Sequence, residues 1–360
     1  MLRSLRVLAP ILIIIALVIG ALVFSGGGSS SDSAGANSGA APASGPAAPD
    51  FTGGTGWLNS TPLTIAGLQG KAVLVDFWTY SCINCQRTLP YLKQWWEKYK
   101  DRGLVIVGVH SPEFSFEKER ANVQQALATY GVTWPVVMDN DMAIWDAYHN
   151  LYWPHKYLID RSGHIVYDHI GEGGYIETER RIVAALGLDE AKVTGDEPPP
   201  AASPNQTPEL YAGYKRGELA NREPVRNDAV TRFADPHSYL PDRIVLTGGW
   251  AVRDEYIQRA PDNNPGEAKV FLHYRANRLF TVMGNAGAAP LRVYVTLDGK
   301  PLSAGNQGED IKLDDQGQSY VDVTRQDLYR LVATPVFGDH LIALWSDSPD
   351  FRFYTFTFGS

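Results

Sequence analysis

The chain is long enough for two domains and too acidic for a nucleic-acid-binding protein. It has 360 residues, 44% of them hydrophobic, and a formal net charge of −8 at pH 7. This composition supports more than one buried core. The negative charge provides no basic surface, so we expect no nucleic-acid partner. Only two cysteines occur, which limits the sulfur chemistry to a single pair.

The first 24 residues are typical of a membrane anchor. Arg3 and Arg6 precede 18 uncharged residues, Val7 to Phe24, close to the ~20 that a spanning helix needs. A cleaved signal peptide usually has a shorter apolar core. We therefore expect an uncleaved single-pass anchor, with its N-terminus in the cytoplasm and the domains on the extracytoplasmic side. Residues 25–50, rich in Ser, Gly, Ala and Pro, are expected to form a disordered linker.

Residues 51–190 are predicted to form an α/β domain. Apolar runs alternate with segments of helical periodicity, which favours a sheet with a parallel core, and a turn at Arg161-Ser-Gly163 marks a closing antiparallel hairpin. The predicted strands are Trp57–Asn59, Leu63–Ile65, Val73–Trp78, Leu104–Val109, Val136–Met138, Lys156–Asp160 and His164–His169, and the predicted helices are Asn84–Asp101, Phe116–Tyr130, Met142–Tyr148 and Ile176–Leu186.

Cys82 and Cys85 form a C-x-x-C motif at the start of a predicted helix. The free N–H groups and positive dipole end of a helix N-terminus favour a thiolate on Cys82, the nucleophile of thiol–disulfide exchange. Cys85, one turn further in, suits the resolving role. A structural zinc site would need four ligands, and a purely structural disulfide across so short a loop would stabilise little. We expect a redox-active disulfide and no metal or other cofactor.

The surrounding sequence resembles thioredoxin. The likeness rests on Val75-Asp-Phe-Trp78, the C-x-x-C motif and Pro90, and the longer pattern is similar to the membrane-tethered TlpA/ResA type. The resemblance implies a thioredoxin-like fold, thiol–disulfide oxidoreductase activity on protein substrates and a membrane electron donor of the CcdA/DsbD type. A likeness to the DipZ-like family covers residues 51 to 360 and includes Phe77–Tyr91, Gly108–Glu113, Trp153-Pro154 and Gly171-Glu-Gly173.

Other side chains are expected to serve the cysteine pair. Asp76 lies in an apolar strand, where the resemblance implies a buried acid of raised pKa that exchanges a proton with Cys85; the alternative is a partly exposed edge residue. Trp153-Pro154 matches the cis-proline loop of thioredoxins, so we expect a cis bond and backbone pairing with substrate. Further substrate contacts are expected from Trp78, Ile83 and Asn84, and Glu113 is expected either to approach the site or to remain a solvated carboxylate.

A rival chemistry fits part of the same motif. Thr79-Tyr-Ser-Cys82 matches the Thr-x-x-Cys of AhpC/TSA-like thiol peroxidases. Val75 stands where that family has a proline, and the adjacent Cys85 suits dithiol exchange better. Thiol peroxidase activity is therefore the alternative for this domain.

A second, all-β domain is predicted at 209–360, beyond a Pro-rich linker at 191–208. Short strands with period-two alternation and turn signals favour a β-sandwich or jelly roll. Ala276-Asn277 and Asp298-Gly299 are predicted as hairpin turns. The predicted strands are Ile244–Leu246, Lys269–Tyr274, Arg278–Met283, Leu291–Leu297, Ser319–Val323, His340–Trp345 and Phe351–Phe358.

The function of this second domain is open at the level of sequence. The DipZ-like resemblance implies similarity to a carbohydrate-binding module, with a glycan, the cell wall or a partner protein as ligand. Aromatic side chains can stack on sugar rings, although those in strands more often fill a core; the candidates are Trp250, Tyr256, Tyr274 and Trp345. The second functional hypothesis is therefore a wall-binding adaptor with a scaffold thioredoxin domain. Sequence does not set the direction of electron flow.

Overall fold

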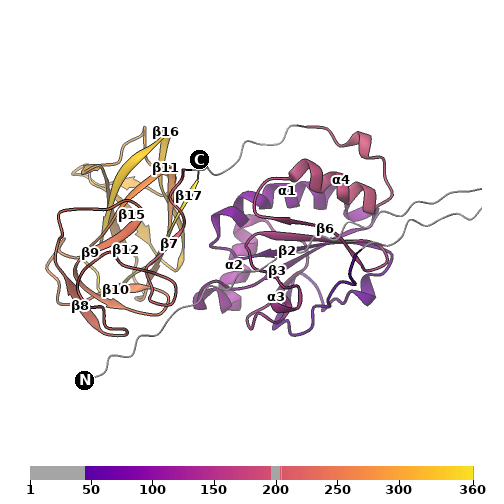
Figure 1. The fold of residues 1–360 in the computed structure, drawn as a ribbon, viewed down its shortest axis with the longest axis horizontal. Coiled ribbons are helices and arrows are strands. Elements are labelled where there is room, and N and C mark those ends of the chain that lie inside the picture. The colour runs from indigo at the N-terminus through magenta and orange to yellow at the C-terminus, as the bar shows by residue number, and fades with distance from the viewer. Residues whose placement is uncertain (1–44, 196–202, 204, 360) are drawn as a thin grey trace, which may run out of the picture. The chain divides into compact units, whose positions relative to one another are not determined.

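The computed structural model describes residues 45–195, 203 and 205–359 (Figure 1). The predicted anchor at 1–24 and most of the predicted linker at 25–50 lie outside these residues. Within the described ranges no helix is long and apolar enough to span a membrane. Regular pairing begins inside the predicted linker, because Ala47 forms a β-bridge with His164 and the Ala48 N–H donates to the Gly163 carbonyl over 2.9 Å.

The first domain contains a six-stranded sheet in the order β1-β4-β3-β2-β5-β6. Strands β2, β3 and β4 are parallel, whereas β5 is antiparallel to β2 and to β6. The predicted parallel core with a closing hairpin is confirmed. The strands are β1 (Gly56–Leu58), β2 (Ala72–Trp78), β3 (Leu104–His110), β4 (Val136–Met138), β5 (His155–Ile159) and β6 (Ile165–Ile170).

Four α-helices and four short 3-10 turns complete this domain. The helices are α1 (Ile83–Tyr99), α2 (Arg120–Tyr130), α3 (Ala143–Ala147) and α4 (Tyr175–Ala185), and the turns are η1 (Ala66–Leu68), η2 (Lys100–Arg102), η3 (Ser115–Lys118) and η4 (Glu190–Lys192). The predicted strand at Leu63–Ile65 is wrong. The Ile65 N–H donates to the Asp50 carboxylate over 2.9 Å instead of joining a ladder, and the chain then enters η1.

The two faces of β2 pack in different cores. Leu74 and Trp78 belong to a cluster with side chains of α1, α2 and α4, whereas Val73, Val75 and Phe77 pack in a cluster that includes α3 (Figure 1). Because alternate residues of a strand point to opposite faces, Asp76 shares the face of Leu74 and Trp78. Its carboxyl therefore lies beneath helix α1, the helix that begins at the cysteine motif.

The second domain is all-β, as predicted. Its strands form one hydrogen-bonded sheet in the order β14-β15-β12-β16-β11-β17-β10-β9-β8, with β13 beside β12 and β7 beside β17. This continuous ladder differs from the two separate sheets of a sandwich, yet its apolar side chains meet in a single core. The strands are β7 (Leu210–Tyr211), β8 (Val230–Phe233), β9 (Arg243–Val252), β10 (Ile257–Arg259), β11 (Lys269–Asn285), β12 (Leu291–Leu297), β13 (Lys300–Pro301), β14 (Lys312–Leu313), β15 (Ser319–Val323), β16 (Asp327–Trp345) and β17 (Phe351–Gly359).

The hairpin predicted at Ala276-Asn277 is wrong. Residues 269–285 form the single strand β11, which pairs along its length with β16. The pairing register shifts between Ala276, which pairs with Gly338, and Arg278, which pairs with Ala333. The extra residues therefore form a bulge on β16, and Asn277 continues β11 opposite it.

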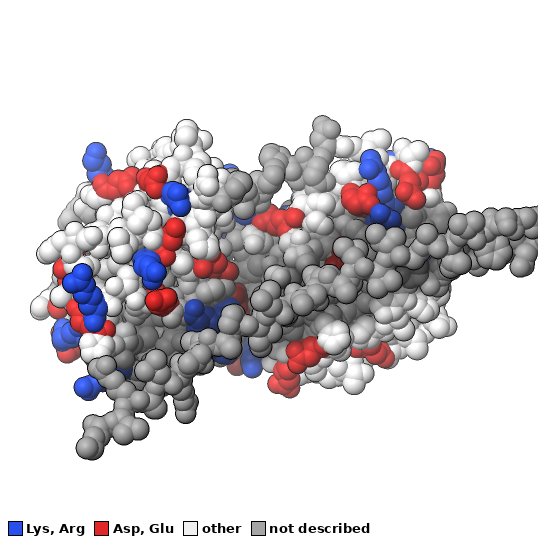
Figure 2. Space-filling model, in the orientation of Figure 1, with Lys and Arg blue, Asp and Glu red and all other residues white. Residues whose placement is uncertain are grey.

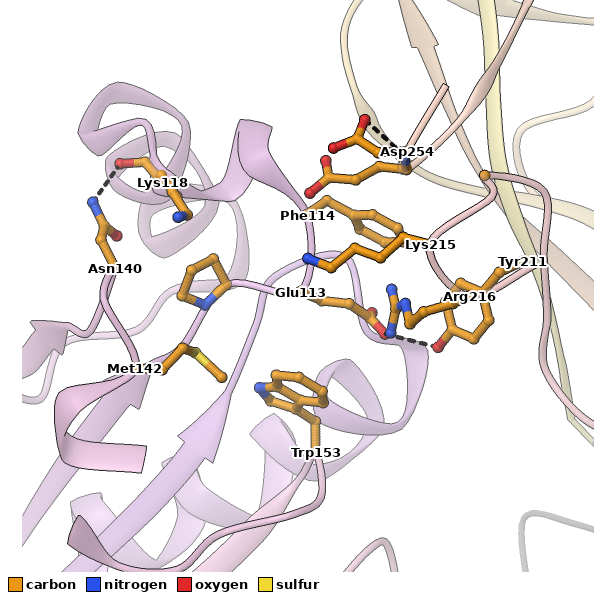
Figure 3. Close-up of a pocket in the computed structure, with 13 residues that line it drawn as sticks. Glu113, Phe114, Lys118, Asn140, Met142, Trp153, Tyr211, Lys215, Arg216 and Asp254 are labelled. Atoms are coloured by element: carbon orange, nitrogen blue, oxygen red, sulfur yellow. Dashed lines mark hydrogen bonds and ion pairs between the residues drawn. The ribbon is translucent and has the colours of Figure 1, made fainter. Parts of the chain in front are cut away.

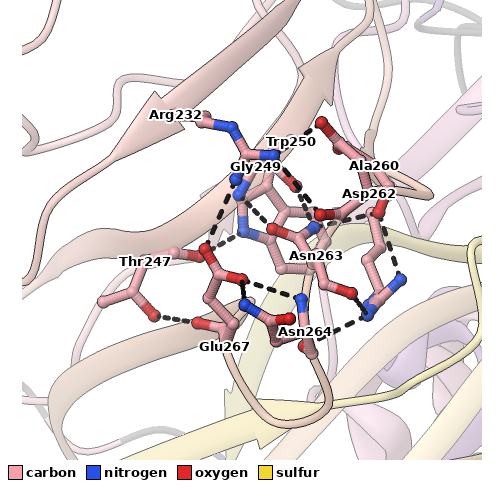
Figure 4. Close-up of polar contacts among 10 residues, drawn as sticks. Arg232, Thr247, Gly249, Trp250, Ala260, Asp262, Asn263, Asn264 and Glu267 are labelled. Atoms are coloured by element: carbon pink, nitrogen blue, oxygen red, sulfur yellow. Dashed lines mark hydrogen bonds and ion pairs between the residues drawn. The ribbon is translucent and has the colours of Figure 1, made fainter.

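Two of the aromatic residues proposed to bind sugar are core residues. Trp250 and Tyr274 are both fully buried. The Trp250 Nε1–H donates to the Thr247 carbonyl over 2.8 Å, within a polar network centred on Asn263 (Figure 4). Buried polar atoms that are all paired in this way hold a loop rigidly. The prediction that Trp250 and Tyr274 stack on a ligand is therefore wrong.

Positive and negative side chains are intermixed on the face of the described residues that Figure 2 shows. On the face seen in Figure 2, Lys and Arg side chains are interspersed with Asp and Glu. The face therefore carries no broad field of one sign.

Candidate active site

The cysteine motif lies where β2 gives way to α1. Cys82 is the N-cap residue of α1, and its Sγ accepts a hydrogen bond from the Cys85 N–H over 3.2 Å. Cys82 is partly exposed, whereas Cys85 has only 1% of its surface exposed. The predicted difference in shielding is confirmed, and only the first sulfur faces outward.

The pKa of each cysteine thiol is higher than that of a free cysteine, so each thiol keeps its proton more strongly. Burial raises the pKa of Cys82, and the nearby Glu113 charge raises it further, while the hydrogen bonds with Cys85 lower it. Burial also raises the pKa of Cys85 well above its usual value. The expected stabilisation of a Cys82 thiolate by the helix N-terminus is therefore outweighed by desolvation.

Asp76 is a buried carboxyl close to Cys85. Its side chain is 2% exposed, and Oδ1 has no hydrogen-bond partner among the described residues. Burial raises its pKa to about 7, and the Lys156 charge only partly opposes this effect. The Asp76 charge in turn contributes to the raised pKa of Cys85. The edge-residue alternative is wrong, because the carboxyl lies in the interior.

The Trp153–Pro154 peptide bond is cis, as expected. Pro154 is buried immediately before β5, and Trp153 is partly exposed. The Trp153 indole N–H donates to the Ser111 carbonyl over 3.0 Å, and its ring packs on Trp145 with ring centroids 4.2 Å apart. Trp153 and Cys82 both pack against the core cluster that lies beneath α1.

Glu113 approaches the cysteine motif and is held there by the second domain. Its Oε1 accepts hydrogen bonds from the Tyr211 hydroxyl over 2.7 Å and from Arg216 over 2.9 Å (Figure 3). Only 9% of its side chain is exposed. The solvated-loop alternative is wrong, because this carboxylate is paired and largely buried. Its charge raises the pKa of Cys82, and a role of Glu113 at the site stays a prediction.

Comparison with known proteins agrees with this arrangement. The model of the AhpC/TSA family matches residues 44–168, and the model of the thioredoxin like C-terminal domain matches residues 207–359. Thiol-disulfide oxidoreductase YkuV of Bacillus subtilis is 30% identical over 142 residues, which is 39% of this chain and 95% of YkuV. The chain belongs to the thioredoxin-like thiol–disulfide oxidoreductases.

One further relative, DipZ, matches more of this chain than the first domain alone. Protein DipZ of Mycobacterium tuberculosis is 37% identical over 265 residues, which is 71% of this chain and 37% of DipZ. Thiol-disulfide oxidoreductase ResA of Halalkalibacterium halodurans is 31% identical over 114 residues, which is 32% of this chain and 62% of ResA. The expected resemblance to the TlpA/ResA type and to DipZ is confirmed. The chain spans little more than a third of the length of DipZ.

Two residues expected to touch substrate, Trp78 and Ile83, are buried. Trp78 is 1% exposed, and its ring lies edge-on to His110 with ring centroids 5.3 Å apart. Ile83 is 5% exposed and packs in a cluster made largely by the second domain. The remaining buried members of that cluster are Phe114, Phe280, Val282, Leu328 and Tyr354. Trp78 and Ile83 are therefore packing residues, while Asn84 is partly exposed.

The second domain contacts the first turns of α1 through polar groups as well. Arg330 donates to the Gln86 side-chain oxygen over 2.5 Å, and the Arg87 guanidinium lies over the Phe280 ring, 5.1 Å from its centroid. On the neighbouring loop, the Glu255 carboxylate accepts hydrogen bonds from the Ser115 N–H over 2.8 Å and from the Ser115 hydroxyl over 2.9 Å. The surface around Cys82 is thus shared between two domains.

Glu117 is a second buried carboxyl at the site, and the sequence analysis did not identify it. It has 0% exposure, and burial raises its pKa to about 7. Its carboxyl accepts hydrogen bonds from the Ser81 hydroxyl over 2.5 Å and from the Glu113 and Phe114 N–H groups over 2.6 and 2.9 Å. Glu117 therefore fixes the residue before Cys82 to the loop that carries Glu113. No local motif marks it, because it falls inside a predicted helix.

Thr79 does not take the position that peroxidase chemistry would require. Its side chain is fully buried, and its hydroxyl lies 3.4 Å from the His110 Nε2. A hydroxyl engaged in the interior is not presented to a peroxide at Cys82. The geometry therefore gives the peroxidase alternative no support.

Proposed function

We propose that the chain exchanges disulfides with protein substrates through Cys82 and Cys85. The observation that carries the proposal is the difference in burial within the pair. Cys82 is partly exposed at the helix N-cap, whereas Cys85 is buried near the Asp76 carboxyl, which has one oxygen without a hydrogen-bond partner in the described part of the chain. This arrangement separates an attacking sulfur from a resolving sulfur and supplies a proton acceptor for the second.

The reaction in the reducing direction proceeds through one mixed disulfide. The Cys82 thiolate attacks a substrate disulfide, forms a Cys82–substrate S–S bond and releases one substrate thiolate, which takes up a proton. Asp76 accepts the Cys85 proton, and the Cys85 thiolate attacks Cys82 Sγ and breaks the Cys82–substrate bond. The second substrate thiolate is released and takes up the proton that Asp76 held. The substrate gains two electrons and two protons, and the enzyme ends with a Cys82–Cys85 disulfide.

The raised thiol pKa values favour this direction. An oxidant of this fold depends on a stabilised thiolate in its reduced form. Here burial disfavours the thiolate on both sulfurs, so the reduced enzyme is a better electron donor. Each catalytic cycle then requires a dithiol donor to reduce the enzyme again, for which we propose a membrane protein of the CcdA/DsbD type.

We further propose that residues 1–24 anchor the enzyme in a membrane and that the part of the 25–50 linker before residue 45 tethers the domains on the extracytoplasmic side. The sequence supports this placement through two arginines before an uninterrupted apolar run. A tether of this length would keep the domains within reach of a membrane electron donor.

Trapping of the mixed disulfide tests the assignment. Reduced protein is mixed with insulin as the disulfide substrate, and adducts are separated by non-reducing electrophoresis. The Cys85→Ser variant is expected to accumulate an adduct with insulin, whereas Cys82→Ser forms none. Insulin reduction by Cys82→Ser at the wild-type rate would instead support the adaptor hypothesis, in which the thioredoxin part is only a scaffold.

A glycan or cell-wall ligand for the second domain is a second proposal, favoured by a row of aromatic side chains. Trp345 on β16, Tyr294 on β12 and Tyr320 on β15 are direct neighbours across the sheet. The Trp345 and Tyr294 rings are stacked with centroids 5.5 Å apart, and both residues are partly exposed. Tyr320 is 8% exposed, so the accessible part of the row is the Trp345–Tyr294 pair, which suits stacking on a sugar ring.

Retention of the full chain on insoluble peptidoglycan tests this ligand. Trp345→Ala is expected to reduce the retained fraction, while Val336→Ala, which truncates an exposed side chain of the same strand, leaves it unchanged. Equal retention of both variants and the wild type would contradict the proposal.

A further inference from the structure

A cleft of about 280 Å³ is lined by residues of both domains (Figure 3). The first domain contributes an apolar part that includes Phe114, Met142 and Trp153, and the second contributes Lys215, Arg216 and Glu255. The size suits a few side chains rather than the flat surface of a folded protein.

The position of the cleft connects it with the reactive sulfur. Glu113, which lines the cleft, is near enough for its charge to act on Cys82. Phe114 lines the cleft and packs in the same cluster as Ile83, the residue after Cys82. Trp153, which also lines the cleft, directly precedes the cis-proline. A chain lying in the cleft would therefore contact Phe114, which packs with the residue that follows Cys82.

Some charged side chains of the cleft form hydrogen bonds or ion pairs with other residues of the protein, and others do not. Glu113 is paired with Arg216, and Glu255 accepts two hydrogen bonds from Ser115. Lys118 and Lys215 are exposed, and neither ammonium group has a hydrogen-bond or ion-pair partner within the described residues. The cleft also holds the exposed Asp254 carboxylate, which accepts from the Glu255 N–H, and the Asn140 side-chain oxygen, which has no hydrogen-bond partner among the described residues. With two unpaired ammonium groups against this one carboxylate, the charge left unpaired in the cleft is net positive.

We propose that this cleft binds the extended segment of a substrate polypeptide that carries the target cysteine, with an apolar side chain against Trp153 and Met142 and an acidic side chain at Lys215. This inference rests on the proposed function. It makes the second domain part of the substrate site, and Lys215 a residue that sets specificity for acidic segments. Because Ile83 is covered by the second domain, the cleft is the route by which such a segment reaches Cys82.

The test compares charge-reversed peptides on charge-reversed enzymes. Two octapeptides each carry one cysteine as a 2-thiopyridyl disulfide next to a leucine, and differ only in flanking glutamates or lysines. The enzymes are the reduced full chain, Lys215→Glu, and the control Lys300→Glu, which reverses an exposed lysine of β13 outside the cleft. Release of 2-thiopyridone gives kcat/KM, and 2,2′-dithiodipyridine serves as a small uncharged substrate.

We expect Lys215→Glu to lower kcat/KM for the glutamate peptide roughly fivefold, the size of one exposed charge pair, and to raise it for the lysine peptide. Lys300→Glu should leave both peptides within about twofold, and no charge variant should alter the rate with dithiodipyridine. Equal effects of Lys215→Glu on the two peptides, or no effect, would overturn the cleft as the binding site. Reaction of Cys82→Ser with dithiodipyridine at the wild-type rate would instead overturn the proposed function itself.

Discussion

Two buried carboxyls, Asp76 and Glu117, flank the cysteine pair and differ in their surroundings. Burial raises the pKa of each to about 7, a value at which a group both accepts and returns a proton near neutral pH. Asp76 has an unpartnered oxygen near Cys85, whereas both Glu117 oxygens are occupied by hydrogen bonds. Asp76 is therefore suited to proton transfer, and Glu117 to positioning Ser81 and the Glu113 loop.

Replacement of Asp76 tests its role in resolution. Asp76→Asn is expected to slow the attack of Cys85 on the mixed disulfide about 100-fold at pH 7, because the proton acceptor is lost, while the first attack by Cys82 is preserved. Stopped-flow measurement of the two phases with a peptide disulfide separates the steps. Asp141→Asn, at an exposed position of the same domain, is the control. Unchanged resolution in Asp76→Asn would contradict a role in proton transfer.

Glu117 should make the protein less stable as the pH rises. Its pKa is about 7 in the folded chain, compared with an ordinary value of 4.5, so the folded state holds a proton that the unfolded state releases. Its contribution to stability is complete below pH 4.5 and is lost as the pH rises toward 7. In urea unfolding at pH 5 and pH 8, Glu117→Gln should therefore lose less free energy of unfolding than the wild type. An equal loss in both proteins would contradict the raised pKa.

The strands that contact α1 are apolar on both faces over part of their length. Phe280 and Val282 of β11 and Leu328 of β16 pack against Ile83 of α1 and Phe114, outside the main core of the second domain. A strand at the surface of an isolated sheet would present polar groups in these positions. The apolar residues on the second face of these strands therefore pack against the thioredoxin-like domain. This packing stabilises the wall of the cleft that Phe114 forms.

Truncation on β16 tests this packing. Leu328 is 4% exposed, so Leu328→Ala should cost about 3 kcal/mol of unfolding free energy through lost burial and a cavity. On the same strand Val336 is 72% exposed, and Val336→Ala should stay within about 0.5 kcal/mol of the wild type. Urea titration followed by tryptophan fluorescence measures both. Similar small losses in the two variants would contradict a packed contact.

Local sequence patterns predict where the helices and strands lie. They predict less well whether a strand continues without interruption. The apolar run of β2 and the helical spacing after Cys82 are local signals, and both elements lie where they were predicted. The signal at Ala276-Asn277 is ambiguous, because turn-favouring residues can also lie in a continuous strand opposite a bulge of its neighbour. The strand β11 is therefore predicted as two strands, and the predicted strand Ile244–Leu246 covers only part of β9.

Across the whole chain, the sequence separates two domains but does not reveal that they share the active site. Asp76, Cys82, Cys85 and Trp153-Pro154 could be found because they belong to short motifs. The burial of Ile83, the pairing of Glu113 with Arg216 and Tyr211, and the role of Glu117 depend on contacts between distant segments, which no local periodicity encodes. The burial of Cys82, which raises its pKa against the expected direction, is likewise not visible in the sequence.

The equilibrium reduction potential of the Cys82–Cys85 couple tests the central claim most directly. The full chain is equilibrated in dithiothreitol and glutathione redox buffers, and the thiol state is read by alkylation, with Cys85→Ser as the control that cannot form the intramolecular disulfide. Because burial disfavours both thiolates, we predict a potential near or below about −220 mV, in the range of reducing thioredoxins. A value near −120 mV, as in a disulfide-forming oxidant, would contradict the proposed reductant, and the lack of any two-electron couple would contradict the cysteine pair as the active site.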